Sequence, residues 1–228
     1  MDDLFSDHVV RGRTLDRTDI ERMAGLPRTL IDCDLEEADL SGLDLSHWRF
    51  ERCNLRHTDV SRTGLEGTVW QSCRGAFANL TACDLSEASF ISTDFNNASF
   101  KRANLHSARF SQCKLTGADL FEVKGLELSF DETLLVGAKL AGHSFRKVTL
   151  NRIDFSQADL RKCDFRQTTF AQCSLREANM EGARFDGADL RGADLGGLRL
   201  FDAGMFRGAT ISREQAAQLL SELGLNVR

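Results

Sequence analysis

Large apolar residues recur at every fifth position along most of this chain. From Leu30 to Leu200 only Gly75 and Gly125 break the rule. A small or slim residue often lies two positions before the apolar centre, as in Ala38-Asp39-Leu40 and Ala118-Asp119-Leu120. A period of five fits neither the 3.6-residue period of a helix nor the two-residue period of a strand. The pattern therefore excludes an amphipathic helix and predicts a repeated turn.

A chain that turns a corner every five residues points one large and one small side chain inward per unit, and four such units close a square. This geometry predicts a second period of 20 residues, which the cysteines and aromatic residues test. Each of the following sets shares one phase of that period: Cys33, Cys53, Cys73, Cys113 and Cys173; Cys83 and Cys163; Phe50, Trp70, Phe90, Phe110, Phe130 and Phe170; Phe145, Phe165 and Phe185. We predict an all-β solenoid, a quadrilateral β-helix with stacked columns of side chains inside.

The two ends of the chain depart from the repeat. Residues 1–29 form an N-terminal segment with an imperfect first coil, because residues 23–27 disturb the five-residue spacing. Residues 30–210 form the β-helix, and residues 211–228 form a C-terminal capping or dimerisation helix with a tail. Within the repeats, Gly75 and Gly125 mark either local bulges or short loops, or harmless lapses in the pattern.

A short helix is predicted over about residues 213–223. Ser212-Arg213-Glu214-Gln215 has the pattern of a capping box, and Gly224 is a natural helix stop. The apolar stripe of this helix consists of Ala216, Leu219, Leu220 and Leu223. The stripe closes the last coil, and we expect it also to meet its copy in a second chain, which would make the protein a homodimer.

The charge balance limits the possible partners. The chain has 34 acidic and 29 basic residues and a formal net charge of −5, so it has no excess of cations to neutralise phosphates. Direct nucleic-acid binding is disfavoured. The acidic start lacks the apolar run of a signal peptide, and no stretch approaches the roughly 18 apolar residues of a membrane span. We expect a soluble cytoplasmic protein that does not contact a membrane.

No residue pattern indicates chemistry. The five histidines have no metal-ligand spacing, and no nucleophile elbow, phosphate-binding loop or dinucleotide fingerprint occurs. Seven cysteines without a C-x-x-C pair indicate reduced, buried thiols. His143 occupies a slot for a small inward residue, which favours a strained core position. We expect no metal, no cofactor and no enzymatic activity.

Aspartates just before the apolar centres have two interpretations. Their side chains can hydrogen-bond the backbone of the turn, which is a structural role. Alternatively, rows of carboxylates at regular spacing can imitate the phosphate backbone of duplex DNA for a DNA-binding protein. The candidate partner-binding residues are Asp34, Asp39, Asp59, Asp94, Asp119 and Asp159. A cationic series on later coils, which includes Arg146, Lys147 and Arg152, makes the N-terminal half the more plausible anionic surface.

The Ala-Asp-Leu-x-x units and both ends together resemble one family. Phe206-Arg207-Gly208-Ala209, Glu214-Gln215-Ala216-Ala217 and Leu223-Gly224-Leu225 are similar to the terminal helix and tail of the topoisomerase-protecting pentapeptide-repeat proteins, the Qnr and MfpA group. The segment from Gly12-Arg13 to Asp34-Leu35 resembles the N-terminal segment of MfpA-like members.

This resemblance implies a right-handed β-helix, dimerised through C-terminal helices, that mimics DNA. It implies binding to DNA gyrase, and often to topoisomerase IV, with protection against fluoroquinolones or other gyrase poisons. The mild net charge and the lack of a long projecting loop depart from the Qnr pattern. The alternative hypothesis is a structural or scaffold protein of the same repeat class with an unrelated protein partner.

Overall fold

A computed structural model describes residues 8–198, 203–222 and 224–227 of the 228-residue chain. The chain divides into two compact units, Met1–Phe130 and Asp131–Arg228.

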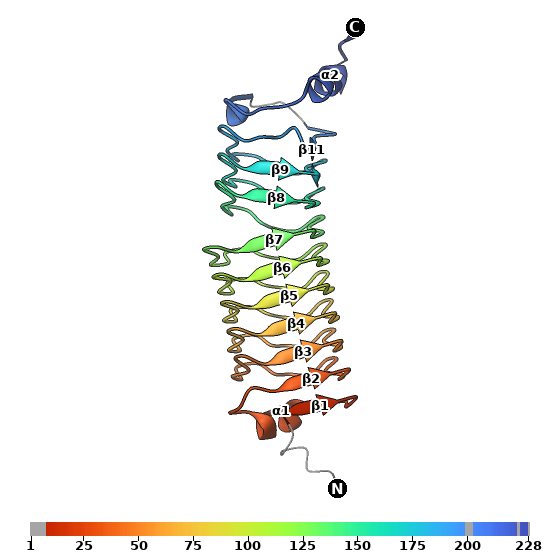
Figure 1. Ribbon diagram of the computed structural model, residues 1–228, viewed down its shortest axis with the longest axis vertical. Helices are drawn as coiled ribbons and strands as arrows, with labels where there is room; N and C mark the ends of the chain where they lie inside the picture. The colour runs from red at the N-terminus through yellow and green to blue at the C-terminus, as the bar shows by residue number, and fades with distance from the viewer. Residues whose placement is uncertain (1–7, 199–202, 223, 228) are drawn as a thin grey trace. The chain divides into compact units, whose positions relative to one another are not determined.

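The first unit is a stack of square coils, as predicted. Its strands are β1 (Val9–Arg11), β2 (Thr29–Ile31), β3 (Arg49–Glu51), β4 (Val69–Gln71), β5 (Ser89–Ile91) and β6 (Arg109–Ser111), with β7 (Ser129–Asp131) at the boundary. Neighbours from β1 to β6 pair in parallel, each 20 residues beyond the last, with Leu30 opposite Phe50. Figure 1 shows β2 to β6 one above another. The predicted period of 20 residues is confirmed.

The other three sides of each coil are held by single parallel bridges with the same spacing. We call the strand side one, and number the others by their bridge columns in the first unit: side two (residues 34, 54, 74, 94 and 114), side three (39, 59, 79, 99 and 119) and side four (44, 64, 84, 104 and 124). Every side therefore hydrogen-bonds to the coils before and after it, which satisfies the backbone without long strands.

Stacked aromatic rings fill the core of the first unit. Ring centroids lie 4.1 Å apart for Phe50 and Trp70, 5.6 Å for Trp70 and Phe90, and 4.5 Å for Phe90 and Phe110. Phe110 and Phe130 continue the column at 5.3 Å. All five side chains are buried. The predicted aromatic ladder is confirmed, and burial of such rings is the main stabilising term of the fold.

Most corners place one residue in the left-handed backbone region. It lies two positions after the apolar centre, as in Glu37, His57 and Phe77, with φ of 58°, 57° and 62°. This conformation costs roughly 1–2 kcal/mol for a residue with a Cβ. The amide of Glu37 donates to Arg56 O at 2.9 Å, and that of His57 to Ala76 O at 3.1 Å. These bonds between coils offset the strain and turn the corner side chains outward.

The coils continue in register through both glycine centres. The bridges between residues 74 and 94 and between residues 104 and 124 are intact, so neither Gly75 nor Gly125 produces a bulge or a projecting loop. A Cβ on Gly75 would lie 2.2 Å from a ring carbon of Phe95 in the next coil. The missing side chain at position 75 makes room for that ring, which sequence periodicity within one coil does not reveal.

The first coil contains a helix that the sequence reading missed. Helix α1 (Arg17–Met23) begins after Asp16, whose side chain accepts a hydrogen bond from the Asp19 amide, while Asp19 Oδ2 accepts one from the Asp16 amide. Ile20 and Met23 of this helix are buried. The strand β1 and Thr14 pair with the next coil, and this capping box, which the five-residue spacing does not predict, starts a helix where a third side would follow. The helix covers apolar side chains at the end of the stack.

The second unit repeats the same architecture on its own. Strands β8 (Thr149–Asn151) and β9 (Thr169–Ala171) pair in parallel, as do β10 (Cys173–Ser174) and β11 (Ala193–Asp194). Phe145, Phe165, Phe185 and Phe206 stack with centroids 5.1, 4.9 and 4.9 Å apart. The 3-10 helix η1 (Ala203–Phe206) precedes Thr210, which bridges Asp189.

The predicted C-terminal helix is confirmed as α2 (Arg213–Glu222). Ser212 N donates to Gln215 Oε1 at 2.7 Å, and Gln215 N donates to Ser212 Oγ at 3.2 Å, which completes the predicted capping box. Gln215 Nε2 also donates to the carbonyls of Leu190 and Ala193 at 2.7 and 2.6 Å, so it fastens the helix to the last coils. Within the described residues, no helix is long and apolar enough to cross a membrane.

Candidate interaction surface

The six candidate carboxylates all take part in turns. Each accepts a hydrogen bond, 2.8–3.2 Å long, from the amide two residues later in the chain; the pairs are Asp34 and Glu36, Asp39 and Ser41, Asp59 and Ser61, Asp94 and Asn96, Asp119 and Phe121, and Asp159 and Arg161. The structural interpretation therefore holds at every position. These bonds also fix the direction of each carboxylate, which leaves the second oxygen to face other groups.

In the side-three column of the first unit, only one pair of neighbouring coils carries a carboxylate in both coils. Asp39 lies in register with Asp59, and Asn79, Ser99 and Asp119 follow along the column. Asp119 is buried and its Oδ2 lies 3.3 Å from Lys101 Nζ. Hydrogen bonds from the Ser41 hydroxyl and amide lower the pKa of Asp39, which keeps it ionised. Arg17 Nη1 lies 3.6 Å from Asp39 Oδ1 and partly offsets its charge. Asp39 and Asp59 are still the part of this column that presents negative charge.

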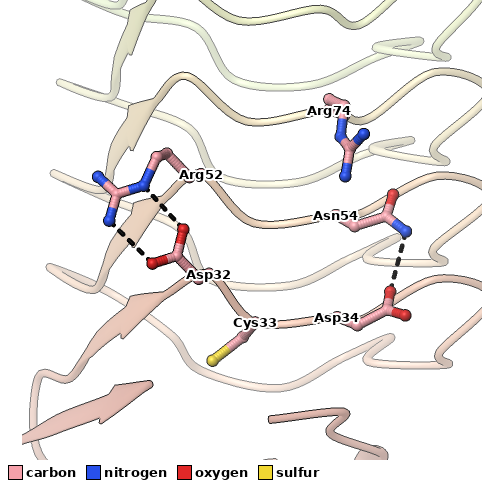
Figure 2. A pocket seen from close by; sticks show the side chains of 6 residues that line it. All are labelled: Asp32, Cys33, Asp34, Arg52, Asn54 and Arg74. Carbon is pink, nitrogen blue, oxygen red and sulfur yellow. Dashed lines mark hydrogen bonds and ion pairs between the residues drawn. The ribbon is translucent and has the colours of Figure 1, made fainter. Parts of the chain in front are cut away.

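On side two the predicted row is interrupted. Asn54 and Arg74 lie between Asp34 and Asp94. Asn54 Nδ2 donates to Asp34 Oδ1 and to Glu36 Oε2, both at 2.9 Å. Figure 2 shows the first of these bonds and the Arg74 guanidinium beyond Asn54. The sequence reading counted the acidic and amide positions of this side and missed the arginine among them.

In the second unit the candidate carboxylate is neutralised by its own neighbour. Arg161 donates to Asp159 through Nε at 2.8 Å and through Nη2 at 2.7 Å, and the pair lowers the pKa of Asp159. Arg191 holds Asp189 in the same way. An Asp-x-Arg spacing visible in the sequence predicts this pairing and was overlooked. Asp159 therefore contributes little free negative charge.

The strongest anionic region is a single coil near the start of the first unit. Residues 29–48 contain no lysine or arginine and six acidic residues, which are Asp32, Asp34, Glu36, Glu37, Asp39 and Asp44. We call this the acidic coil. Asp32 is ion-paired with Arg52 at 2.7 and 2.9 Å (Figure 2). Asp59 extends the negative charge into the next coil along side three.

The candidate dimerisation residues divide between two environments. Leu219 is buried within the chain and closes the last coil, whereas Leu220 remains 40% exposed. Ala216 is partly buried, and Leu223 lies outside the described residues. Leu225 and Val227 add exposed apolar surface after the helix. Closing of the last coil thus accounts for the burial of Leu219. Contact with a second copy of the chain remains a prediction for the exposed apolar side chains.

One hollow of about 270 Å³ is lined by polar groups around Asp32, Arg52 and Arg74. Among the residues that the structure describes, no group of three or more histidine, cysteine or acidic side chains is placed to hold a metal ion. The seven cysteines are buried free thiols. Burial also lowers the pKa of His143 to about 4, so its ring is neutral.

Solved structures of other repeat proteins are similar to this chain. Full-length QnrB1, a plasmid-mediated fluoroquinolone resistance protein, is similar with 17% identity, a TM-score of 0.48 and coverage of 95% of this chain and 97% of that one. HetL, a pentapeptide-repeat protein involved in heterocyst differentiation regulation from the cyanobacterium Nostoc sp. strain PCC 7120, is 23% identical over 86% of this chain and 94% of its own, with a TM-score of 0.46.

No curated protein sequence matches the chain. The family described as pentapeptide repeats matches in eight copies, over residues 30–69, 76–120, 129–167 and 163–200. These ranges cover most of the chain and coincide with the square coils. The chain therefore belongs to the pentapeptide-repeat family.

Proposed function

We propose that this protein binds DNA gyrase, with topoisomerase IV as a second target, by presenting an anionic surface that imitates DNA. In this proposal the protein is noncatalytic, acts in the cytoplasm, modulates the enzyme and protects it from fluoroquinolones or other gyrase poisons. The observation that carries the proposal is the acidic coil, which continues into Asp59 in register with Asp39. The likeness of both chain ends to the Qnr and MfpA group supports this choice of partner.

The geometry suits recognition by a cationic surface. Successive coils lie about 4.8 Å apart, of the same order as the roughly 3.4 Å spacing of phosphates along one DNA strand. The turn hydrogen bonds hold Asp34, Asp39 and Asp59 in place, so little side-chain entropy is lost on binding. Because the attraction is between exposed charges, affinity should fall as salt rises.

A supercoiling assay with matched variants tests this proposal. The triple variant Asp34→Asn, Asp39→Asn, Asp59→Asn keeps the turn acceptors and removes three charges. Asp159→Asn together with Asp189→Asn is the control, because arginines already neutralise those carboxylates. We expect micromolar wild-type protein to change gyrase supercoiling and the fluoroquinolone cleavage complex. The triple variant should need at least about tenfold more protein, and the control should act as wild type.

Two results would contradict the proposal. One is wild-type protein that leaves both gyrase readouts unchanged at micromolar concentration. The other is a triple variant that acts as strongly as the control at every salt concentration.

We also propose that the protein forms a homodimer through the exposed part of α2 and the tail. Leu220, Leu225 and Val227 expose apolar side chains close together in the sequence, and a second copy would bury them. Sedimentation equilibrium of wild type and Leu220→Glu measures this. A dimer that the substitution converts to monomer is expected, and a monomeric wild type at about 100 µM would overturn the idea.

The second candidate function is a structural or scaffold role with an unrelated protein partner. It is favoured by the pairing of Asp119 and Asp159 with Lys101 and Arg161, which weakens any long anionic surface. Binding of the wild-type protein to immobilised gyrase, displaced by linear duplex DNA, separates the two functions. A scaffold protein would show no such competition.

A further inference from the structure

One corner position breaks the polar rule of the coils. The described non-glycine residues with left-handed backbone at the corners are polar or charged, except Ala82 and Phe77. Phe77 has φ of 62° and its side chain is 52% exposed. A phenyl ring at such a position exposes apolar surface without contributing to the core, so the fold gives no reason for it.

The ring of Phe77 forms a flat exposed stack with His57. The two rings lie one coil apart, with centroids 5.1 Å apart and planes inclined by 2°. Both side chains are exposed. A rigid pair of aromatic faces offers a large contact area at a low entropic cost, which is typical of the centre of a protein interface.

Two arginines flank this stack. Arg56 precedes His57 in its coil, and Arg74 lies three residues before Phe77; both side chains are exposed. Neither takes part in any of the ion pairs of the described residues, whereas Arg52 nearby is paired with Asp32 and Glu51. In Figure 2 the Arg74 guanidinium stands apart from the Asp32 and Arg52 pair. The arginines are therefore available to partner carboxylates.

We infer that Arg56, His57, Arg74 and Phe77, here the Arg–Phe patch, form a docking site for an acidic protein segment that carries an aromatic residue. The partner's ring would pack on Phe77, and its carboxylates would bind the two guanidinium groups. Arg74 also borders the polar hollow of about 270 Å³, whose other charged lining residues are Asp32, Asp34 and Arg52. The patch is opposite in charge to the acidic coil that adjoins it, and Asp34 of that coil lines the same hollow as Arg74.

The orientation of the partner follows from its surroundings. Glu36 and Glu37 lie one coil below Arg56 and His57, and would repel carboxylates on that side. The amides Asn96 and Asn97 lie one coil above Ala76 and Phe77 and carry no charge. The acidic residues of the segment should therefore lie over residues 54–57 and 74–77. The uncharged end of the segment should extend toward residues 96–97 and away from Glu36 and Glu37.

Fluorescence anisotropy with a labelled synthetic peptide tests the inference. The peptide carries one tryptophan with a pair of acidic residues on each side, and a second peptide replaces the acidic residues with lysine. The variants are Phe77→Ser and Arg74→Gln. The controls are Phe121→Ser, a phenylalanine in the turn after side three that is 47% exposed, and Arg102→Gln, an exposed corner arginine. Thermal unfolding of each variant verifies that the fold is retained.

We expect saturable binding of the acidic peptide to wild type with a Kd of about 100 µM or tighter. Both patch variants should weaken binding by at least about tenfold, and both controls by less than about twofold. The lysine peptide should bind at least about tenfold more weakly than the acidic one. The triple aspartate variant should keep full peptide binding, which distinguishes this result from any outcome with gyrase.

Three outcomes would overturn the inference. The first is no saturable binding up to about 1 mM peptide. The second is equal loss in the Phe77→Ser variant and the Phe121→Ser control. The third is self-association of wild type that Phe77→Ser abolishes, because the patch would then be an interface between copies of this chain.

Discussion

Adding a single methyl group at Gly75 should destabilise the first unit strongly. A Cβ at this position would lie 2.2, 2.5 and 2.6 Å from three ring carbons of Phe95, whereas ordinary contacts begin at 3.4 Å. The ring would have to move by about 1.2 Å. It cannot do so freely, because its centroid lies 5.4 Å from that of Phe90, 5.9 Å from that of Trp70 and 6.1 Å from that of Phe100.

The expected cost follows from overpacking. Inserting a methyl group into a filled core typically costs about 1–3 kcal/mol. The backbone of Gly75 is not left-handed, so any loss comes from the clash and not from φ strain. Phe95→Leu removes the opposing ring and supplies the residue found at the other centres of side two, Leu35, Leu55 and Leu115. In that background Gly75→Ala should cost less than about 0.5 kcal/mol.

Tryptophan fluorescence during denaturant unfolding measures this coupling. The chain has two tryptophans, Trp48 and Trp70, both in the first unit, and Trp70 touches the Phe95 ring. Wild type, both single variants and the double variant form a complete cycle. A coupling free energy of about 1 kcal/mol or more supports the argument. A Gly75→Ala variant as stable as wild type, or strictly additive costs, would refute the account of how the coils accommodate this glycine.

Further predictions concern the second unit and the thiols. Because burial holds the pKa of His143 near 4, below its ordinary value of 6.5, protonation opposes folding; stability should fall by about 1–3 kcal/mol as pH drops from about 6.5 to 4. His143→Ala should flatten this part of a calorimetric pH profile, and an identical profile would contradict the assignment. Gln215→Ala removes the bonds to Leu190 O and Ala193 O and should cost about 1–3 kcal/mol by calorimetry. The control Gln218→Ala, which loses a bond only to Glu222, should cost less than about 0.5 kcal/mol, and equal losses would exclude the fastening role. Burial raises the pKa of Cys83 and Cys163 to about 12, so a chromogenic disulfide reagent should modify these two thiols of native protein only at the rate of unfolding; their rapid reaction in folded protein would show that the core around them is open.

The core was predictable because each inward position repeats one physical requirement. A large apolar residue every fifth position and cysteines in phase over 20 residues predicted the stacking of Phe90 on Phe110. The same reasoning did not predict α1, where the Asp16 and Asp19 capping box competes with the five-residue spacing. The five-residue period shows which side chains share a column. The start of a helix depends instead on a capping box of a few residues, which a period measured over the whole chain does not reveal.

The outward surface was less predictable because its properties depend on pairs. Asp159 fits the repeat as well as Asp39, yet Arg161 neutralises it. Asp34 and Asp94 share a column, but Arg74 lies between them. Phe77 lies off the five-residue spacing of the apolar centres, and nothing in that spacing predicts its stack with His57. Counting charges by column predicts where carboxylates lie and does not predict which of them remain free.

The 20-residue register also limits how such a chain can change in length. Removing or duplicating a whole coil would bring equivalent residues opposite each other again, so the aromatic and cysteine columns would simply become shorter or longer. A one-residue deletion would instead rotate every following inward side chain out of its column. Natural variation in this chain should therefore consist of point substitutions and of insertions or deletions of whole coils. Deletion of one or a few residues should disrupt the fold, because it shifts the register of every later coil.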